Sequence, residues 1–202
     1  MKGVLDFYND TAHIWSDNWY ENNSLTPYLR DFFKYLPNNP RILDLCCGAG
    51  YESMRMASLG GNVVGLDFSD TSIAIARERN PNIKFVVEDM LNDYSYLGKF
   101  NGCAVIAGLV HLTYDKLPIA FKQIHNVLLP NGILFIVVED GNGKNTNSSY
   151  TNVNGNHYDR EFYKHSLDSL IKSSNNMFHF VKEIKIETDD CWRYYIFKRE
   201  NN

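Results

Sequence analysis

The chain has 202 residues, enough for one domain with a substantial core. Its 44% hydrophobic and 22% charged residues are typical of globular proteins and exclude collagen-like, coiled-coil and wholly disordered chains. A net charge of −4 argues against a dedicated nucleic-acid surface. No apolar run reaches the roughly 18 residues that a membrane-spanning helix needs. The amino terminus also lacks a signal-peptide pattern, so we expect a cytoplasmic protein that binds neither nucleic acid nor membrane.

The first forty residues are predicted to form a helical cap. Aromatic residues recur there at helical spacing, from Phe7 to Trp19 and again from Tyr28 to Leu36. Because no linker or repeat is visible, residues 1–202 are expected to form a single domain with a cap at 1–40, a core at 41–140 and a closing part at 141–202. The four cysteines show no metal-ligand spacing, and we expect no metal site.

Short apolar strands alternate with helices in the core. The pattern predicts strands at 42–45, 62–68, 83–87, 100–109 and 133–139, and helices at 52–59, 70–79 and 117–129. Gly60 and Gly61 end the first of these helices, and Asn80 and Pro81 end the second. Such alternation, with nearly continuous apolar strands, indicates a parallel sheet covered by helices on both faces.

The closing part changes character. Residues 141–157 are rich in Asn, Gly, Ser and Thr without periodicity, so a long loop is expected there, and loops of this length usually carry function. A helix is predicted at 160–173. Strands at 178–186 and 192–198, separated by turn-forming residues, are expected to pair as an antiparallel hairpin.

Glycines and acids follow the first three predicted strands. Gly48 and Gly50 form a tight turn after the first strand, where glycine lets the backbone approach a ligand and adopt left-handed angles. Asp67 ends the second strand, where a carboxylate can accept hydrogen bonds from a ribose diol. Asp89 and Met90 follow the third strand and suit an adenine amine and ring. Each feature alone is weak, but three at consecutive strand ends indicate a nucleotide-like ligand.

Several runs of the core resemble a known family. RILDLCCGAG at 41–50, VVGLDFS at 63–69, VEDM at 87–90 and LLPNGI at 128–133 look like the motifs of class I S-adenosylmethionine-dependent methyltransferases of the small bacterial methyltransferase-domain type. The resemblance covers residues 41–140. It implies a Rossmann-like three-layer α/β sandwich, with a mostly parallel seven-stranded sheet, a C-terminal antiparallel hairpin and an N-terminal helical cap.

The resemblance also implies which residues contact S-adenosylmethionine. It assigns the methionine part to Asp44 and the turn of Gly48 and Gly50, the ribose to Asp67, the adenine faces to Phe68 and Met90, and the adenine amine to Asp89. The expected cofactor-binding set also includes Cys46, which stands where the family commonly has Gly, together with Gly108, Tyr8 and Trp15. For Tyr8 and Trp15, packing of the cap on the domain is the open alternative to a lid.

Catalysis is less readable from the sequence. Methyl transfer from a sulfonium is a displacement in which placement of the nucleophile supplies much of the acceleration. His111, after the fourth strand, is a candidate base that would accept the acceptor's proton, with a purely structural histidine as the alternative. Tyr158 and Arg160 follow the polar segment and are candidate substrate contacts, with surface placement as the alternative.

These observations predict an enzyme that transfers a methyl group from S-adenosylmethionine to an O, N or other nucleophilic atom of a small molecule. The expected partner is that acceptor, and the chain is expected to be a monomer or homodimer. Two alternatives stay open: an NAD(P)-dependent oxidoreductase and a non-catalytic S-adenosylmethionine-binding module. The dinucleotide pattern expects a third glycine, where this chain has Ser53, and this weakens the oxidoreductase interpretation.

Overall fold

The structure is a computed structural model that describes residues 2–145, 149–151, 155, 157–159, 161–184 and 191–201. The helices are α1 (Lys2–Tyr20), α2 (Thr26–Phe33), α3 (Tyr51–Ser58), α4 (Asp70–Arg79), α5 (Leu117–Val127) and α6 (Leu167–Ser173), with short 3-10 turns η1 (Ser95–Leu97) and η2 (Leu109–His111). The strands are β1 (Arg41–Leu45), β2 (Asn62–Asp67), β3 (Lys84–Val87), β4 (Phe100–Ile106), β5 (Leu128–Glu139), β6 (Asn142–Asn145), β7 (Ser149–Thr151), β8 (His157–Asp159), β9 (Phe162–His165), β10 (Phe178–Ile184) and β11 (Trp192–Arg199).

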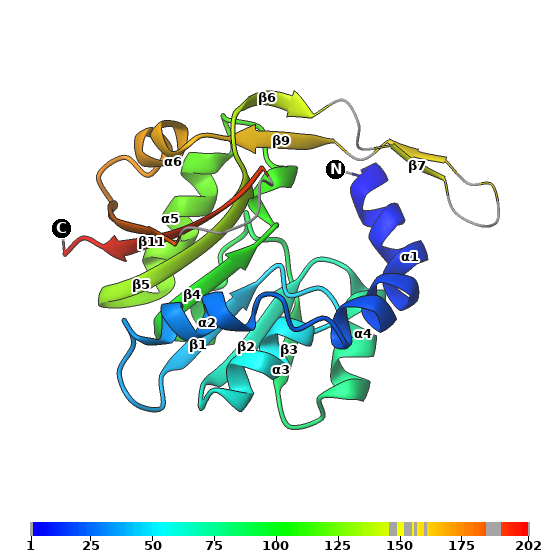
Figure 1. Cartoon of the computed structure of the whole chain (residues 1–202), viewed down its shortest axis with the longest axis horizontal. Coiled ribbons are helices and arrows are strands. Elements are labelled where there is room, and N and C mark those ends of the chain that lie inside the picture. The colour runs from blue at the N-terminus through cyan, green and yellow to red at the C-terminus, as the bar shows by residue number, and fades with distance from the viewer. Residues whose placement is uncertain are drawn as a thin grey trace.

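Seven strands form one sheet in the order β10-β11-β5-β4-β1-β2-β3 (Figure 1). The strands β1 to β5 pair in parallel, with Asp44 of β1 opposite Gly65 of β2 and Ala104 of β4. β11 runs antiparallel to β5 and to β10. The predicted mostly parallel seven-stranded sheet with a C-terminal antiparallel hairpin is therefore confirmed.

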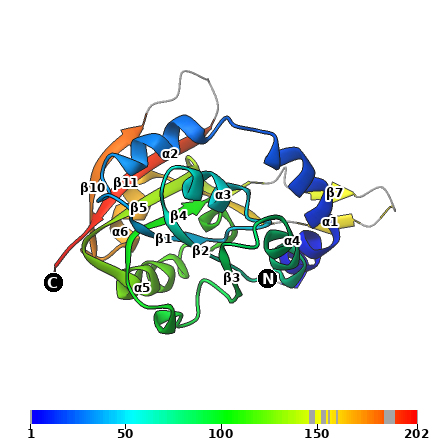
Figure 2. The same cartoon turned by 90° about the horizontal axis from the view of Figure 1, so that it is seen from below.

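Helices cover both faces of this sheet (Figure 2). On one face, Phe32 of α2 and Met56 of α3 share a buried cluster with Ile42 of β1. On the other face, Phe121 of α5 is buried in a second cluster with Leu43 of β1. Neighbouring residues of β1 belong to different clusters because successive side chains of a strand point to opposite faces. The three-layer arrangement follows from this alternation.

The two helices of the predicted cap, α1 and α2, pack on different parts of the sheet. α2 packs on a face of the sheet, whereas α1 lies across the end of the sheet where the parallel strands terminate (Figure 1). The Tyr20 hydroxyl donates to the carbonyl of Ala49 at 2.7 Å, and the Arg55 guanidinium donates to the carbonyl of Trp19 at 2.5 Å. These bonds fix the C-terminal end of α1 against the chain that follows β1.

The expectation of an aperiodic loop at 141–157 is wrong for the residues that the structure describes. β6 pairs antiparallel with β9, and β7 pairs antiparallel with β8, as two small ribbons beyond the main sheet (Figure 1). Backbone hydrogen bonds hold such ribbons, so their strands need no apolar alternation. Residues 146–148, 152–154 and 156 lie outside the described residues.

The helix expected at 160–173 begins later, at Leu167. Ser166 caps it, since its hydroxyl accepts a hydrogen bond from the backbone N–H of Ser169 at 3.3 Å. The preceding Phe162–His165 is the strand β9. His165 is fully buried and hydrogen-bonded through Nε2 to the carbonyl of Leu109 at 2.9 Å. This contact and the pairing with β6 override the helical pattern of the local sequence.

Candidate active site

The turn between β1 and α3 is built on left-handed backbone angles. Cys46, Gly48 and Gly50 have φ values of 63°, 52° and 83°. A Cβ added at Gly48 would have no non-neighbouring heavy atom nearer than the Tyr51 hydroxyl at 3.8 Å, so this side of the turn is open. A Cβ at Gly50 would lie 2.9 Å from the Phe85 ring, so packing alone requires glycine there.

Asp67, at the end of β2, joins this turn to the start of α4. Its two carboxylate oxygens accept backbone hydrogen bonds, one from Gly48 and one from Ser69, both at 2.9 Å. Burial raises the pKa of Asp67, and backbone hydrogen bonds from Ser69, Gly48 and Phe68 oppose that rise. The four lone pairs of the carboxylate exceed these three donors, so it can still accept a ligand hydroxyl.

Two further carboxyl groups are buried below the turn. The Ser53 hydroxyl donates to Asp44 at 2.5 Å, and Glu52 pairs with Arg55 at 3.0 Å. Burial raises the pKa of each carboxyl to about 7, with Ser53 opposing the rise at Asp44 and Arg55 opposing it at Glu52. A bound cation would favour the ionised forms of both groups.

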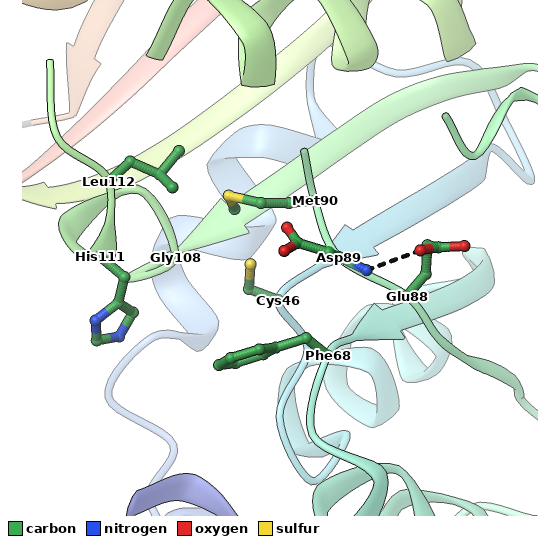
Figure 3. Close-up of a pocket in the computed structure, with 8 residues that line it drawn as sticks. All are labelled: Cys46, Phe68, Glu88, Asp89, Met90, Gly108, His111 and Leu112. Carbon is green, nitrogen blue, oxygen red and sulfur yellow. Dashed lines mark hydrogen bonds between the residues drawn. The ribbon is translucent and has the colours of Figure 1, made fainter. Parts of the chain in front are cut away.

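A cavity opens where four parallel strands end. Its lining comes from the residues after β1, β2, β3 and β4: Cys46, Phe68, Glu88, Asp89, Met90, Gly108, His111 and Leu112 (Figure 3). The predicted strand-end residues therefore converge on one site, as the carboxyl ends of parallel strands are expected to do. Asp44, Asp67 and the two glycines of the turn lie beside this lining rather than in it.

Cys46 and Gly108 meet at the floor of this cavity. A Cβ at Gly108 would lie 2.8 Å from both Cβ and Sγ of Cys46, so only glycine lets the chain after β4 approach the turn this closely. Burial raises the pKa of the Cys46 thiol, and nearby carboxylates raise it further. The thiol is therefore an apolar contact surface at neutral pH and not a nucleophile.

His111 lies at one end of the cavity and contacts the cap. Its Nε2 is hydrogen-bonded to the Tyr8 hydroxyl at 2.9 Å, with the two ring centroids 5.4 Å apart. Tyr8 also lies edge-on to Phe68 at 6.4 Å, and Phe162 of β9 lies edge-on to His111 at 4.9 Å. α1 and β9 therefore close the cavity from two sides.

The other predicted site residues lie elsewhere. Trp15 packs on Phe7, with ring centroids 6.4 Å apart, and does not line the cavity. Tyr158 packs on the same Phe7 ring at 5.7 Å, and its hydroxyl donates to Asp10. Trp15, within α1, and Tyr158, in β8 against α1, therefore both lie away from the cavity lining. Arg160 lies outside the described residues.

Besides Glu88, the neighbour of the predicted Asp89, two residues of the site were not predicted from the sequence: Leu112, which lines the cavity, and Phe162, which contacts His111. Phe162 fell within a predicted helix, so its position beside His111 depended on the unexpected pairing of β9 with β6. Leu112 follows the short turn η2, which begins at the last residue of the strand predicted at 100–109. No local sequence signal identified either residue, because both are placed by tertiary contacts.

Within the described ranges, no group of three or more His, Cys, Asp or Glu side chains is arranged to hold a metal ion. In the same part of the chain, we find no helix with the length and apolar character needed to cross a bilayer.

Comparisons with known proteins agree with this geometry. Residues 42–132 match the methyltransferase domain family. A putative methyltransferase of Bacillus subtilis, YqeM, is 32% identical over 108 residues, or 51% of this chain and 44% of that protein. The chain spans less than half the length of the first curated relatives that it matches.

Solved structures show the same fold along nearly the whole chain. A TehB-like S-adenosylmethionine-dependent methyltransferase from Corynebacterium glutamicum superposes with a TM-score of 0.74 at 17% identity, covering 96% of this chain and 99% of that one. The 1,6-didemethyltoxoflavin-N1-methyltransferase of Burkholderia thailandensis, with its acceptor and S-adenosylhomocysteine bound, gives 0.73 at 16% identity, covering 99% and 88%. The chain therefore has the class I S-adenosylmethionine-dependent methyltransferase fold, and its residues 42–132 are similar to the methyltransferase domain family.

Proposed function

We propose that the protein is an S-adenosylmethionine-dependent methyltransferase that acts on a small molecule. The observation that carries the proposal is the convergence of four strand ends on one cavity, with Asp67 and Asp89 beside the apolar side chains of Phe68 and Met90. The net charge of −4 and the structural neighbour that binds 1,6-didemethyltoxoflavin support a small molecule rather than a nucleic acid.

The residues present fit S-adenosylmethionine part by part. Phe68 and Met90 would contact the adenine faces, and Asp89 would accept from its amine. Asp67 can still accept a ribose hydroxyl, and the open side of Gly48 leaves room beside the turn. The buried carboxyls of Asp44 and Glu52 suit a nearby ammonium group, since a positive charge would stabilise their ionised forms.

When bound, S-adenosylmethionine supplies a methyl group on a positively charged sulfur. The work of the protein is then to place the acceptor, exclude water and receive a proton where the acceptor loses one. Tyr8 of α1 and Phe162 of β9 are positioned to exclude water at the His111 end of the cavity. The imidazole of His111 is the group in the cavity lining suited to accepting a proton at neutral pH.

The oxidoreductase alternative fits the site less well. Ser53 occupies the place of the third glycine of the dinucleotide pattern, and its buried hydroxyl donates to Asp44. The non-catalytic alternative differs only in the absence of turnover, so it is separated by a methylation assay rather than by geometry.

Calorimetric titration with S-adenosylhomocysteine and with NAD tests the proposal. We expect micromolar or tighter binding of S-adenosylhomocysteine and none of NAD, followed by acceptor-dependent methylation when a metabolite extract is supplied with S-adenosylmethionine and read by mass spectrometry. Binding of NAD in place of S-adenosylhomocysteine would overturn the proposal. Binding without methylation of any extract component would favour the non-catalytic module.

A further inference from the structure

Aromatic rings from three separate elements gather at the His111 end of the cavity: Phe68 belongs to the lining, and Tyr8 and Phe162 contact the His111 ring. Tyr8 comes from α1, Phe162 from β9 and Phe68 from the end of β2. The Tyr8 and Phe162 centroids lie 5.4 and 4.9 Å from that of His111, both in edge-to-face geometry, and Tyr8 meets Phe68 at 6.4 Å. Edge-to-face contacts of this kind favour another aromatic ring over an aliphatic group of equal size.

Charge is distributed unevenly along the cavity. Of the described residues that line it, the two with acidic side chains, Glu88 and Asp89, lie at the end opposite to His111 (Figure 3). The lining near His111 consists of Gly108, Leu112 and the ring of Phe68, with Cys46 and Met90 between the two ends. The described lining holds no Lys or Arg to pair with an anionic acceptor, and its acidic side chains lie away from His111, so the His111 end suits a neutral molecule.

The phenol side chain of Tyr8 already forms a hydrogen bond with His111, because its hydroxyl lies 2.9 Å from Nε2. We propose, building on the proposed function, that the methyl acceptor is a neutral aromatic compound with a ring hydroxyl, and that this hydroxyl replaces that of Tyr8 on His111. Tyr8 is half-buried and can turn outward about its own side-chain torsions, whereas its neighbour Phe7 is fully buried and keeps α1 in place.

The exchange gives His111 a defined chemical task. With its proton on Nδ1, the imidazole accepts a hydrogen bond from the acceptor hydroxyl through Nε2. As the O–CH₃ bond forms and the S–CH₃ bond of the sulfonium breaks, the hydroxyl proton passes to Nε2. Positive charge thus moves from sulfur to the imidazolium, which afterwards releases the proton to water. An aromatic hydroxyl suits this step because it is far more acidic than an aliphatic alcohol.

Phenol binding, followed by NMR of the histidine side chain, tests the inference without turnover. The probes are phenol, toluene and cyclohexanol, which separate the ring from the hydroxyl. We expect phenol to bind more tightly than either comparator and to shift the His111 Nε2 resonance. His111→Phe keeps a ring but no nitrogen, and it should abolish the preference for phenol over toluene.

Tyr8→Phe gives the sharper test, because it removes only the competing hydroxyl. Phenol should bind this variant about fivefold more tightly, as expected when one competing hydrogen bond of ordinary strength is lost. Tyr35→Phe is the matched control: Tyr35 is partly exposed and does not line the cavity, and phenol should bind this variant as it binds the wild-type protein.

Weaker phenol binding to Tyr8→Phe would overturn the inference, since Tyr8 would then hold the acceptor rather than yield to it. Equal binding of phenol and toluene to the wild-type protein would overturn it as well. S-adenosylhomocysteine is titrated into the same samples. Its binding without phenol binding would remove only this inference, whereas phenol binding without S-adenosylhomocysteine binding would remove the proposed function.

Discussion

Asp67 accepts hydrogen bonds from the backbone of the protein, in addition to its proposed bonds with a ligand. Its two oxygens hold the backbone N–H groups of Gly48 and Ser69, which belong to the segments after β1 and β2. The same carboxylate is the proposed partner of the ribose hydroxyls. A substitution at this position therefore changes both the geometry of the turn and the ligand contact, and the two effects need separate variants.

Asp67→Ala is expected to weaken S-adenosylhomocysteine binding by about 1.5–3 kcal/mol, because two ribose hydroxyls lose a charged acceptor. Asp67→Asn should lose less, since the amide oxygen still accepts one hydrogen bond. Calorimetry gives the dissociation constants, and thermal unfolding shows whether each variant stays folded. An unchanged dissociation constant in folded Asp67→Ala would remove Asp67 from the cofactor site.

The raised pKa values of Asp44 and Glu52, both about 7, predict pH-dependent binding. In the proposed complex, the ionised carboxylates would attract the ammonium group of the ligand, and the protonated forms would not. Affinity for S-adenosylhomocysteine should therefore rise as pH increases from 6 to 8, with proton release on binding. Calorimetry in buffers of different ionisation enthalpy measures those protons. Asp44→Asn should reduce the release, and pH-independent affinity across this window would refute the assignment.

The two glycines of the turn should separate stability from binding. Gly50→Ala combines a φ of 83° with a Cβ placed 2.9 Å from the Phe85 ring, and should cost roughly 2–4 kcal/mol of unfolding free energy. Gly48→Ala has open space and should cost about 1 kcal/mol, yet lower S-adenosylhomocysteine affinity about tenfold by filling that space. Wild-type affinity in Gly48→Ala would show that this side of the turn does not face the ligand.

At the scale of elements, α1 is held unequally at its two ends. Its C-terminal end is fixed by Arg55, which is buried, pairs with Glu52 at 3.0 Å and donates to the carbonyl groups of Trp19 and Tyr20. Nearer its N-terminal end, side-chain bonds such as Tyr8 to His111 and Ser69 to Asn9 hold it over the cavity. Because the C-terminal end is held in place, the segment near Tyr8 can move slightly while α1 stays packed on the domain.

Arg55→Met tests that anchor. It leaves the Glu52 carboxylate buried without its partner, and should lower the free energy of unfolding by about 3–5 kcal/mol at pH 8. Proteases should then cut the segment between α1 and α2, at residues 21–25, faster than in the wild-type protein. Adding Glu52→Gln removes the unpaired charge and should recover part of the stability. If Arg55→Met unfolds at the wild-type urea concentration, the pair does not anchor α1.

Sequence patterns predicted the strands of the main sheet. They did not predict the strands of the two small ribbons beyond it. The alternation of apolar runs and helices located β1, β2, β4 and β5 because a strand buried on both faces has a composition of its own. β6 and β9 carry no such signal, since they pair with each other outside the main sheet. The left-handed angle of Cys46 was likewise not predictable, because cysteine has no preference for it.

At the scale of the whole molecule, the candidate site joins segments that are distant in sequence. Residues after four strands line it, α1 covers it from the N-terminal part of the chain, and β9 approaches it from the C-terminal part. The match with the methyltransferase domain family ends at residue 132, so β9 lies beyond it, as α1 lies before it. We therefore expect the family-like core to bind the cofactor and the two flanking elements to determine acceptor choice.

Ligand binding should consequently stabilise more than the matched core. At a free S-adenosylhomocysteine concentration of 100 times Kd, binding adds about 2.7 kcal/mol to the free energy of unfolding, which for a chain of this length corresponds to roughly 5–10 °C in Tm. Hydrogen exchange measured with and without ligand should show slower exchange in the turn after β1, at the end of β2 and in the N-terminal half of α1. The β10–β11 pair lies at the far edge of the sheet and should change little. A rise in Tm with protection confined to the core would mean that α1 covers the cavity without responding to the cofactor, and acceptor choice would then be sought in β9 alone.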